Sequence, residues 1–404
     1  MCDCAALEKV MTLSPTPPGN NFLRSDALSL PEPIYPLDLY LCRTCCHVQL
    51  GHVVDPAILY RNSYNYVSGT SSKFVEHLEQ YASTVVDRFA LKRGGLVADI
   101  GSNDGTGLRF FQRAGMNVLG VDPAQEIAAR ATESGIPTLC EFFSRDLAVR
   151  LRRQYGPAAF ISSHNACAHI DQLDDVFRGV EHWLAGDGVF GLEVGYFLDV
   201  YQNTWFDTIY HEHLDYHTVG PFPALLARVG MEAVGVERVS PQGGSIRLFV
   251  QKVHGPQKTD QSVATLTELE RQAGLCAPET FAAFGRRIDD VGARLRALLG
   301  SLKSQGKSIA GYGAPTKSTT LLNHFRIGKD QLDFLVDDNP LKYGLFSPVT
   351  HIPVFPPAEL YQRRPDYVLI LAWNFATPIM AAHQQFAAEG GRFIVPMPTV
   401  RIVE

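Results

Sequence analysis

Apolar residues recur along the chain at two different spacings. Between residues 64 and 90 they fall three or four positions apart, which predicts an amphipathic helix; they are Phe74, Leu78, Tyr81, Val85 and Phe89. Short apolar runs follow, among them 96–100 and 117–121, and they end at a glycine or an aspartate. Such runs are typical of buried strands in a parallel sheet. The alternation of strand, turn and helix predicts an α/β fold.

The same layout returns in the last third of the chain. Residues 259–304 carry an apolar helical face and predict a helical linker. Behind it, 308–310 enters a glycine turn at 311–313, and a later apolar run, 332–336, ends at Asp337. We therefore expect two Rossmann-like units in a chain of 404 residues, preceded by a small cysteine-bearing module. The expected domains are 1–62, 63–255 and 256–404.

Composition narrows the class of protein. Hydrophobic residues make up 46% and charged residues 19%, which is typical of a globular chain. Lys and Arg number 36 against 42 Asp and Glu, and no basic stretch stands out, so we expect no nucleic-acid partner. No apolar run approaches the roughly 18 residues of a membrane span, and the first residues lack the layout of a signal peptide. We expect no membrane association and a cytoplasmic location.

The eight cysteines are grouped rather than dispersed. A reducing compartment and a large core make a disulfide framework unexpected. Cys42 and Cys45 form a C-x-x-C turn, and Cys2 and Cys4 form a shorter pair some 40 residues earlier. Between the pairs, prolines and a glycine at 14–21 predict a stretch without regular structure. We predict a structural Zn²⁺ held by these four cysteines, with no position left for a catalytic water; the alternative is reduced, uncoordinated thiols.

A nucleoside site is predicted where the first parallel strand ends. The turn reads Asp99-x-Gly101-x-Asn103-x-Gly105, and the next strand ends at Asp122, 21 residues after Gly101, where an acid can accept hydrogen bonds from ribose hydroxyls. A dinucleotide fingerprint would read G-x-G-x-x-G. This turn instead resembles motif I of S-adenosylmethionine methyltransferases; the alternative is a glycine turn in another doubly wound sheet.

Two further groups of polar residues lie near predicted strand ends. The segment 160–170 reads as a fourth strand with Asn165 and His169 at its carboxyl end, the edge where ligands bind in such sheets. Residues 210–213 read Tyr-His-Glu-His, which is not the H-E-x-x-H pattern of a zinc protease. A histidine that titrates near pH 6.5 suits acid–base chemistry better.

Taken together, the motifs resemble the nucleotide-sugar C-methyltransferases of deoxysugar biosynthesis, which methylate carbon three of a 4-keto sugar. The resemblance covers essentially the whole chain, and only the short first cysteine pair departs from the family pattern. It rests on residues 42–50, 64–66, 100–105, 165–169, 210–213, 243–247, 311–317, 336–342, 351–353 and 372–374. It implies S-adenosylmethionine as the methyl donor and a nucleotide-linked 4-keto sugar, most often carried on dTDP, as the substrate.

The resemblance also implies roles for particular residues. His213 is the expected base that removes the carbon-three proton, with Glu212 and Tyr210 beside it to orient or relay. His169 or Tyr210 would donate a hydrogen bond to the enolate oxygen. Tyr64 would line the same cavity, with Tyr66 as the alternative. Further implied contacts are Pro123 and Asn165 with the cofactor, and Ser245, Arg247, Lys317 and Asn374 with the substrate.

Two other classes of function stay open at this point. The second glycine turn could serve an NAD-dependent sugar-nucleotide oxidoreductase, although Thr316 replaces its third glycine and Pro315 lies in the turn. The chain could also be a non-catalytic adaptor whose zinc module binds a partner. Binding of S-adenosylhomocysteine without NAD would exclude the first, and methyl transfer to a keto sugar would exclude the second.

Overall fold

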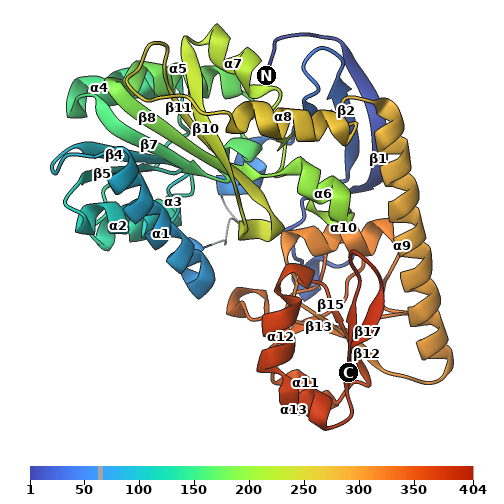
Figure 1. The fold of residues 1–404 in the computed structure, drawn as a ribbon. Helices are drawn as coiled ribbons and strands as arrows, with labels where there is room; N and C mark the ends of the chain where they lie inside the picture. Colours follow the sequence, from blue (N-terminus) through green and yellow to red (C-terminus); the bar gives the residue numbers. More distant parts are fainter. Residues whose placement is uncertain (62–66, 404) are drawn as a thin grey trace.

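In the part of the chain that the structure describes, the strands form three separate sheets that are joined by helices (Figure 1). The computed structural model describes residues 1–61 and 67–403. A small antiparallel sheet comes first, a Rossmann-like sheet follows, and a second, mostly parallel sheet lies toward the C-terminus. This is the α/β fold class that the sequence predicts.

The N-terminal sheet has the order β1-β2-β3-β9. Its strands are β1 (Leu7–Thr16), β2 (Tyr35–Cys42), β3 (Val48–Leu50) and β9 (Asp215–Tyr216). The expectation of irregular chain from residue 14 is wrong for 14–16, which belong to β1. Pro15 is tolerated because β1 is an edge strand and its register shifts between Leu13 and Thr16. The fourth strand, β9, comes from outside the first 62 residues.

The central sheet has the order β10-β11-β8-β7-β4-β5-β6; its β10–β11 and β11–β8 pairs are antiparallel, and the other pairs are parallel. The predicted strands 96–100 and 117–121 are confirmed as β4 and β5. The seven strands are β4 (Leu96–Ile100), β5 (Asn117–Val121), β6 (Thr138–Leu139), β7 (Ala158–His164), β8 (Leu184–Gly195), β10 (Met231–Val239) and β11 (Ser245–Lys252).

Helices cover both faces of this sheet because successive strand residues point to opposite sides. Val97 and Phe160 pack in one apolar cluster with residues of α1 and α2, whereas Ala98 and Ile161 pack in another with α4 and α5. The helices are α1 (Ser72–Arg88), α2 (Thr106–Arg113), α3 (Gln125–Glu133), α4 (Arg145–Tyr155), α5 (Leu173–Trp183), α6 (Phe197–Asn203) and α7 (Phe222–Arg228). The helix predicted within 64–90 begins at Ser72, after Ser71 caps its first turn.

The predicted helical linker is two helices, α8 (Ser262–Gln272) and the long α9 (Pro278–Ser304). In Figure 1, α9 runs from beside β1 to the C-terminal sheet. That sheet has the order β14-β13-β12-β15-β16-β17, with β12 (Ile309–Tyr312), β13 (Phe334–Val336), β14 (Val354–Phe355), β15 (Tyr367–Ile370), β16 (Arg392–Val395) and β17 (Arg401–Val403). Its helices are α10 (Thr316–His324), α11 (Glu359–Arg363), α12 (Ala376–Ala382) and α13 (Gln384–Ala388).

A disulfide links two distant parts of the chain, which the sequence did not lead us to expect. Cys46, in the β2–β3 turn, is bonded to Cys276, in the turn between α8 and α9, 230 residues later. The remaining six cysteines are free, so the bridge is not part of a framework. Across the described parts of the chain, we find no helix that combines the length and the hydropathy needed to cross a membrane.

Candidate active site and metal site

Three of the four predicted metal ligands converge beside the β2–β3 turn. The sulfur atoms of Cys2, Cys42 and Cys45 all lie within 4.8 Å of one another. Burial would raise the pKa of Cys42, but the backbone N–H groups of Cys45 and Thr44 point at its sulfur and lower it. Three converging thiols with such support fit a Zn²⁺ ion. Cys4 lies outside this triad and instead accepts a hydrogen bond from the Thr44 hydroxyl at 3.0 Å.

Neighbouring side chains lie very close to the glycines of the turn after β4. Gly101 and Gly105 have φ angles of 73° and 74°, and Asn103 has φ 51°, in the left-handed region that Asn tolerates. A Cβ on Gly101 would lie 2.4 Å from the Cβ of Ala166, and one on Gly105 would lie 2.8 Å from Ile136. The turn therefore needs glycine at both positions for conformation and for space.

Asp122 lies at the end of β5, where the sequence predicts a ribose contact. Its Oδ2 accepts the N–H of Asn103 at 2.8 Å, and its Oδ1 accepts the N–H of Ala124 at 2.9 Å. Burial raises the pKa of Asp122, and these two N–H groups partly offset the rise. Each carboxylate oxygen keeps a second lone pair for a ligand hydroxyl. Pro123 follows directly.

Asp99 is buried on β4 beneath the same turn. The Ser162 hydroxyl donates to its Oδ1 at 2.8 Å, and burial raises the pKa of Asp99 to about 7. Above the turn, the N–H of Ser68 donates to Asn103 Oδ1 at 2.9 Å, so the chain just before α1 covers the loop. Tyr64 and Tyr66, the aromatic residues expected to line the catalytic cavity, lie outside the described residues.

The residues after β7 form a turn rather than more strand. β7 ends at His164, Asn165 adopts φ 60°, and residues 166–169 form the 3-10 turn η4 (Ala166–His169). The Asn165 N–H donates to the Glu193 carbonyl at 2.7 Å. His169, the last residue of η4, has its ring centroid 5.0 Å from that of His213. Two of the expected site histidines are therefore neighbours.

His213 lies in a chain of hydrogen bonds. Its Nδ1 is 2.9 Å from the carbonyl oxygen of Thr208, and its Nε2 is 2.8 Å from the hydroxyl of Tyr210. A carbonyl can only accept, so Nδ1 carries the proton and Nε2 accepts from Tyr210. Burial lowers the pKa of His213 to about 4, although the Thr208 carbonyl acts to raise it. The imidazole is therefore neutral near pH 7, with its basic nitrogen directed at the phenol.

Tyr60 belongs to this group and was missed by the sequence analysis. It lies in η2 (Ala57–Arg61), and its hydroxyl is 3.1 Å from His169 Nδ1 and 3.4 Å from the Glu212 carbonyl oxygen. Its place in a tyrosine-rich segment, four residues before Tyr64, was the signal available in the sequence. Its contact with His169 spans 109 residues, which no local pattern predicts.

Glu212 lines a small cavity. The cavity holds about 60 Å³ and is lined by Pro18, Asn20, Asn21, Pro33, Ile58, Leu59 and Glu212. The Asn20 side chain donates to Glu212 Oε1 at 3.3 Å. Burial raises the pKa of Glu212 to about 7, although the nearby positive charge of Lys342 acts to lower it. The carboxyl group can therefore hold or release a proton near neutrality.

The C-terminal candidates lie together at the start of α10 and in the turn after β15. Lys317 Nζ donates to Asn374 Oδ1 at 2.6 Å and sits 3.7 Å over the ring of Trp373. Burial lowers the pKa of Lys317 to about 8, and Asp207 acts to raise it. Trp373 donates its indole N–H to Asp207 Oδ2 at 2.7 Å. Trp373, which contacts Lys317, thus links the C-terminal candidates to the segment that leads into Tyr210–His213.

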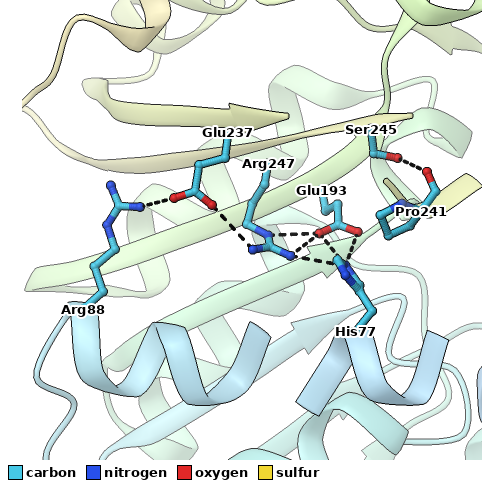
Figure 2. Close-up of polar contacts among 7 residues, drawn as sticks. All are labelled: His77, Arg88, Glu193, Glu237, Pro241, Ser245 and Arg247. Atoms are coloured by element: carbon cyan, nitrogen blue, oxygen red, sulfur yellow. Dashed lines mark hydrogen bonds and ion pairs between the residues drawn. The ribbon is translucent and has the colours of Figure 1, made fainter. Parts of the chain in front are cut away.

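Ser245 and Arg247 on β11 form hydrogen bonds or ion pairs with other residues of the chain. Figure 2 shows the Arg247 guanidinium between Glu193, whose Oε2 is 2.9 Å away, and Glu237, with His77 of α1 beside it. The Ser245 hydroxyl donates to the Pro241 carbonyl at 3.1 Å.

Hydrogen bonding by His77, together with the charges around it, holds the pKa of Glu193 at about 2 although burial would raise it. The Arg247 side chain also helps to line a cavity of about 290 Å³ with His77, Gln80, Tyr81, Thr84, Val239 and Ser240.

The central sheet and its glycine turn have the layout of a methyltransferase domain, and the matches to known proteins identify the molecule as an S-adenosylmethionine-dependent methyltransferase. Family models match three consecutive stretches: residues 1–60 match a "Putative zinc binding domain", residues 74–236 a "Methyltransferase domain" and residues 240–398 a "C-methyltransferase C-terminal domain". The chain is 34% identical over 394 residues to the C-methyltransferase NovU of Streptomyces niveus. The alignment covers 98% of this chain and 94% of NovU. The chain belongs to this C-methyltransferase family.

Among the solved structures that match, two cover less than half of this chain. The YcgJ protein from Bacillus subtilis is 15% identical and covers 43% of this chain and 98% of its own, with a TM-score of 0.34. Magnesium protoporphyrin IX methyltransferase from Synechocystis is 15% identical and covers 44% of this chain and 82% of its own, with a TM-score of 0.35.

Proposed function

We propose that this C-methyltransferase removes the proton from carbon three of a nucleotide-linked 4-keto deoxysugar and methylates the resulting enolate. The observation that carries the proposal is the hydrogen-bond chain from Tyr210 through His213 to the Thr208 carbonyl, with His169 beside it. Carbon methylation needs a positioned base, because a C–H proton next to a ketone must leave before carbon can attack. Methylation of nitrogen or oxygen does not require a proton to be removed from carbon.

The proton has a route through two side chains. The Tyr210 hydroxyl already donates to His213 Nε2 at 2.8 Å, so a proton taken up at the phenol oxygen moves the original one onto His213. The imidazolium that forms is held at Nδ1 by the Thr208 carbonyl. His169 or Tyr60 would donate to the enolate oxygen. The Tyr60 hydroxyl lies 3.1 Å from His169 Nδ1, and the His169 ring centroid lies 5.0 Å from that of His213.

The methyl donor and the nucleotide have separate candidate sites. When bound, S-adenosylmethionine supplies an electrophilic methyl group on a sulfonium. Asp122 would accept its ribose hydroxyls, and the turn from Gly101 to Gly105 would lie against it together with Asn165. Lys317 and Asn374 would contact the nucleotide of the sugar, with dTDP the first choice. Ser245 and Arg247 remain proposed substrate contacts that would have to exchange their present partners.

The metal has a structural role in this proposal. Cys2, Cys42 and Cys45 would hold a Zn²⁺ ion, with Cys4 as the fourth candidate after a change of its side-chain direction. A site closed by thiolates leaves no position for a water, so the ion would stabilise the N-terminal sheet and take no part in methyl transfer.

The proposed function is tested by a substrate screen. Thymidine- and guanosine-linked 4-keto sugars are incubated with labelled S-adenosylmethionine, and the products are analysed for a new carbon–carbon bond. We expect label on carbon three of one sugar class. Label on oxygen or nitrogen, or no transfer to any 4-keto sugar while S-adenosylhomocysteine still binds, would contradict the proposal.

A further inference from the structure

The C-terminal domain holds the segment Asp207–Ile209 by two hydrogen bonds. Trp373 donates its indole N–H to Asp207 Oδ2 at 2.7 Å, and Thr320 of α10 donates its hydroxyl to the Ile209 carbonyl at 2.9 Å. Thr208 lies between these two anchored residues, and its own carbonyl is 2.9 Å from His213 Nδ1. The carbonyl that orients the imidazole is therefore fixed on both sides by the C-terminal domain.

We propose that Trp373 and Thr320 are positioning residues for His213, which act through the Thr208 carbonyl to keep the imidazole in the tautomer whose Nε2 is unprotonated and can take the proton of Tyr210. This inference deepens the proposed function and rests on it for the role of His213 as the base. Both act through the segment Asp207–Ile209 rather than by contact with the reacting atoms. Their effect passes through the backbone of three residues.

Burial makes both anchoring bonds specific. Asp207 is fully buried and Thr320 is 1% exposed, so a donor or acceptor left without its partner there has no bulk water to replace it. Trp373 is held in turn by stacking on Trp205, with ring centroids 4.9 Å apart. Because buried polar groups favour the one arrangement that pairs them, the Asp207–Ile209 backbone has little freedom to rotate the Thr208 carbonyl away.

Trp373 also adjoins the candidate nucleotide contacts. It precedes Asn374 in the chain, and Lys317 lies over its ring. A change at Trp373 could therefore act through nucleotide binding instead of through His213. Thr320 makes its bond to the Ile209 carbonyl from the next turn of α10. A change at Thr320 therefore tests the route through His213 without altering Trp373.

The test compares hydroxyl and indole deletions with matched controls in the full-length protein. Thr320→Val and Trp373→Phe each remove one anchoring bond. Ser318→Ala is the control for the first, because this buried hydroxyl bonds the Pro315 carbonyl at the start of the same helix. Trp183→Phe is the control for the second, since Trp183 is buried and donates its indole N–H to the Gly156 carbonyl.

The first readout needs no sugar substrate. In protein labelled with ¹⁵N-histidine, the His213 signals are assigned by their loss in His213→Asn, and the nitrogen shifts report the tautomer. We expect the Nδ1-protonated form in the wild type and in both controls, and a mixture of tautomers in Thr320→Val, in Trp373→Phe and most clearly in the double variant. An unchanged tautomer in the double variant would overturn the inference, whatever becomes of the proposed function.

The second readout is turnover of the sugar nucleotide. We expect kcat to fall by about tenfold in each single variant and by up to about 10²-fold in the double variant, the scale expected when a catalytic group is displaced. KM for the sugar and the affinity for S-adenosylhomocysteine should stay near wild type. A rise in KM alone, or kcat values equal to those of the controls, would show that the two residues serve the nucleotide or the core instead.

Discussion

The tautomer of His213 decides which atom of the site can take a proton. His213 Nδ1 donates to the Thr208 carbonyl, and Nε2 accepts from Tyr210. Replacing the ring therefore removes the group that would take the proton from Tyr210. In His213→Asn we expect deuterium exchange at carbon three, measured with S-adenosylhomocysteine bound, to fall together with turnover by about 10²-fold or more.

His211→Asn is the control for that change. His211 is fully buried, and its Nε2 lies 3.3 Å from the Tyr35 carbonyl, within the N-terminal sheet. We expect it to lower thermal stability more than it lowers the exchange rate per folded molecule. Exchange at the wild-type rate in His213→Asn would instead make Tyr210 or Glu212 the leading base.

Asp122 carries a second prediction for a single residue. Asp122→Ala removes the acceptor proposed for the ribose and also frees the N–H groups of Asn103 and Ala124. Loss of a charge-assisted hydrogen bond costs about 1.5–3 kcal/mol, so affinity for S-adenosylhomocysteine should fall more than tenfold by calorimetry. Glu126→Gln, an exposed acid on α3, should bind as the wild type does. Equal affinity in the two variants would contradict the assignment.

Glu212 predicts a pH dependence of stability. Burial raises its pKa from 4.5 to about 7 in the folded protein, so the folded state binds a proton that the unfolded state has released between these values. The contribution of Glu212 to the free energy of unfolding is therefore fully present below pH 4.5 and is lost as pH rises toward 7. Glu212→Gln should show a shallower fall in melting temperature between pH 5 and 7 than the wild type. Parallel curves for the two proteins would show that Glu212 is not buried in this way.

At the scale of elements, the sequence predicts the bounds of a strand best where a single local feature sets them. β4 and β5 end where expected because an apolar run meets a glycine or an aspartate that the turn requires. The irregular stretch was predicted to begin at residue 14, but β1 extends to Thr16, since the edge position that tolerates Pro15 depends on which strands pair. The Tyr210–His213 contact joins residues three apart and is within reach of a motif, whereas Tyr60 and Trp373 reach the site only through the tertiary fold.

The β2–β3 turn carries a prediction about metal content. We expect one zinc per chain by elemental analysis, lost in Cys45→Ser and kept in Cys140→Ser, an exposed cysteine outside the triad. Because binding free energy at a closed site is folding free energy, chelation should lower the melting temperature before it slows methyl transfer at lower temperature. Cys4→Ser should have a smaller effect than Cys45→Ser. Freshly purified protein without zinc would end this assignment.

At the scale of the whole molecule, the disulfide is a covalent tie between the N-terminal sheet and the helices that lead to the C-terminal domain. Arg43, in the same turn as Cys46, also donates to the Cys276 carbonyl at 3.4 Å, so the two turns meet through more than the sulfur atoms. A cross-link over 230 residues restricts the unfolded chain strongly, and removing a native bridge typically costs about 2–5 kcal/mol.

We therefore expect Cys276→Ser to melt at a lower temperature than the wild type, and reductant to lower the melting temperature of the wild type but not of the variant. Thiol titration of the denatured, metal-free wild type should find six free cysteines, the number outside the bridge. Cys140→Ser is the control, because it removes an exposed free thiol and should leave both melting curves unchanged. Zinc content is measured in each sample, so that loss of metal is not taken for loss of the bridge. Eight free thiols in protein purified without reductant would show that Cys46 and Cys276 are reduced, and the two turns would then be held together by packing and the Arg43 contact alone.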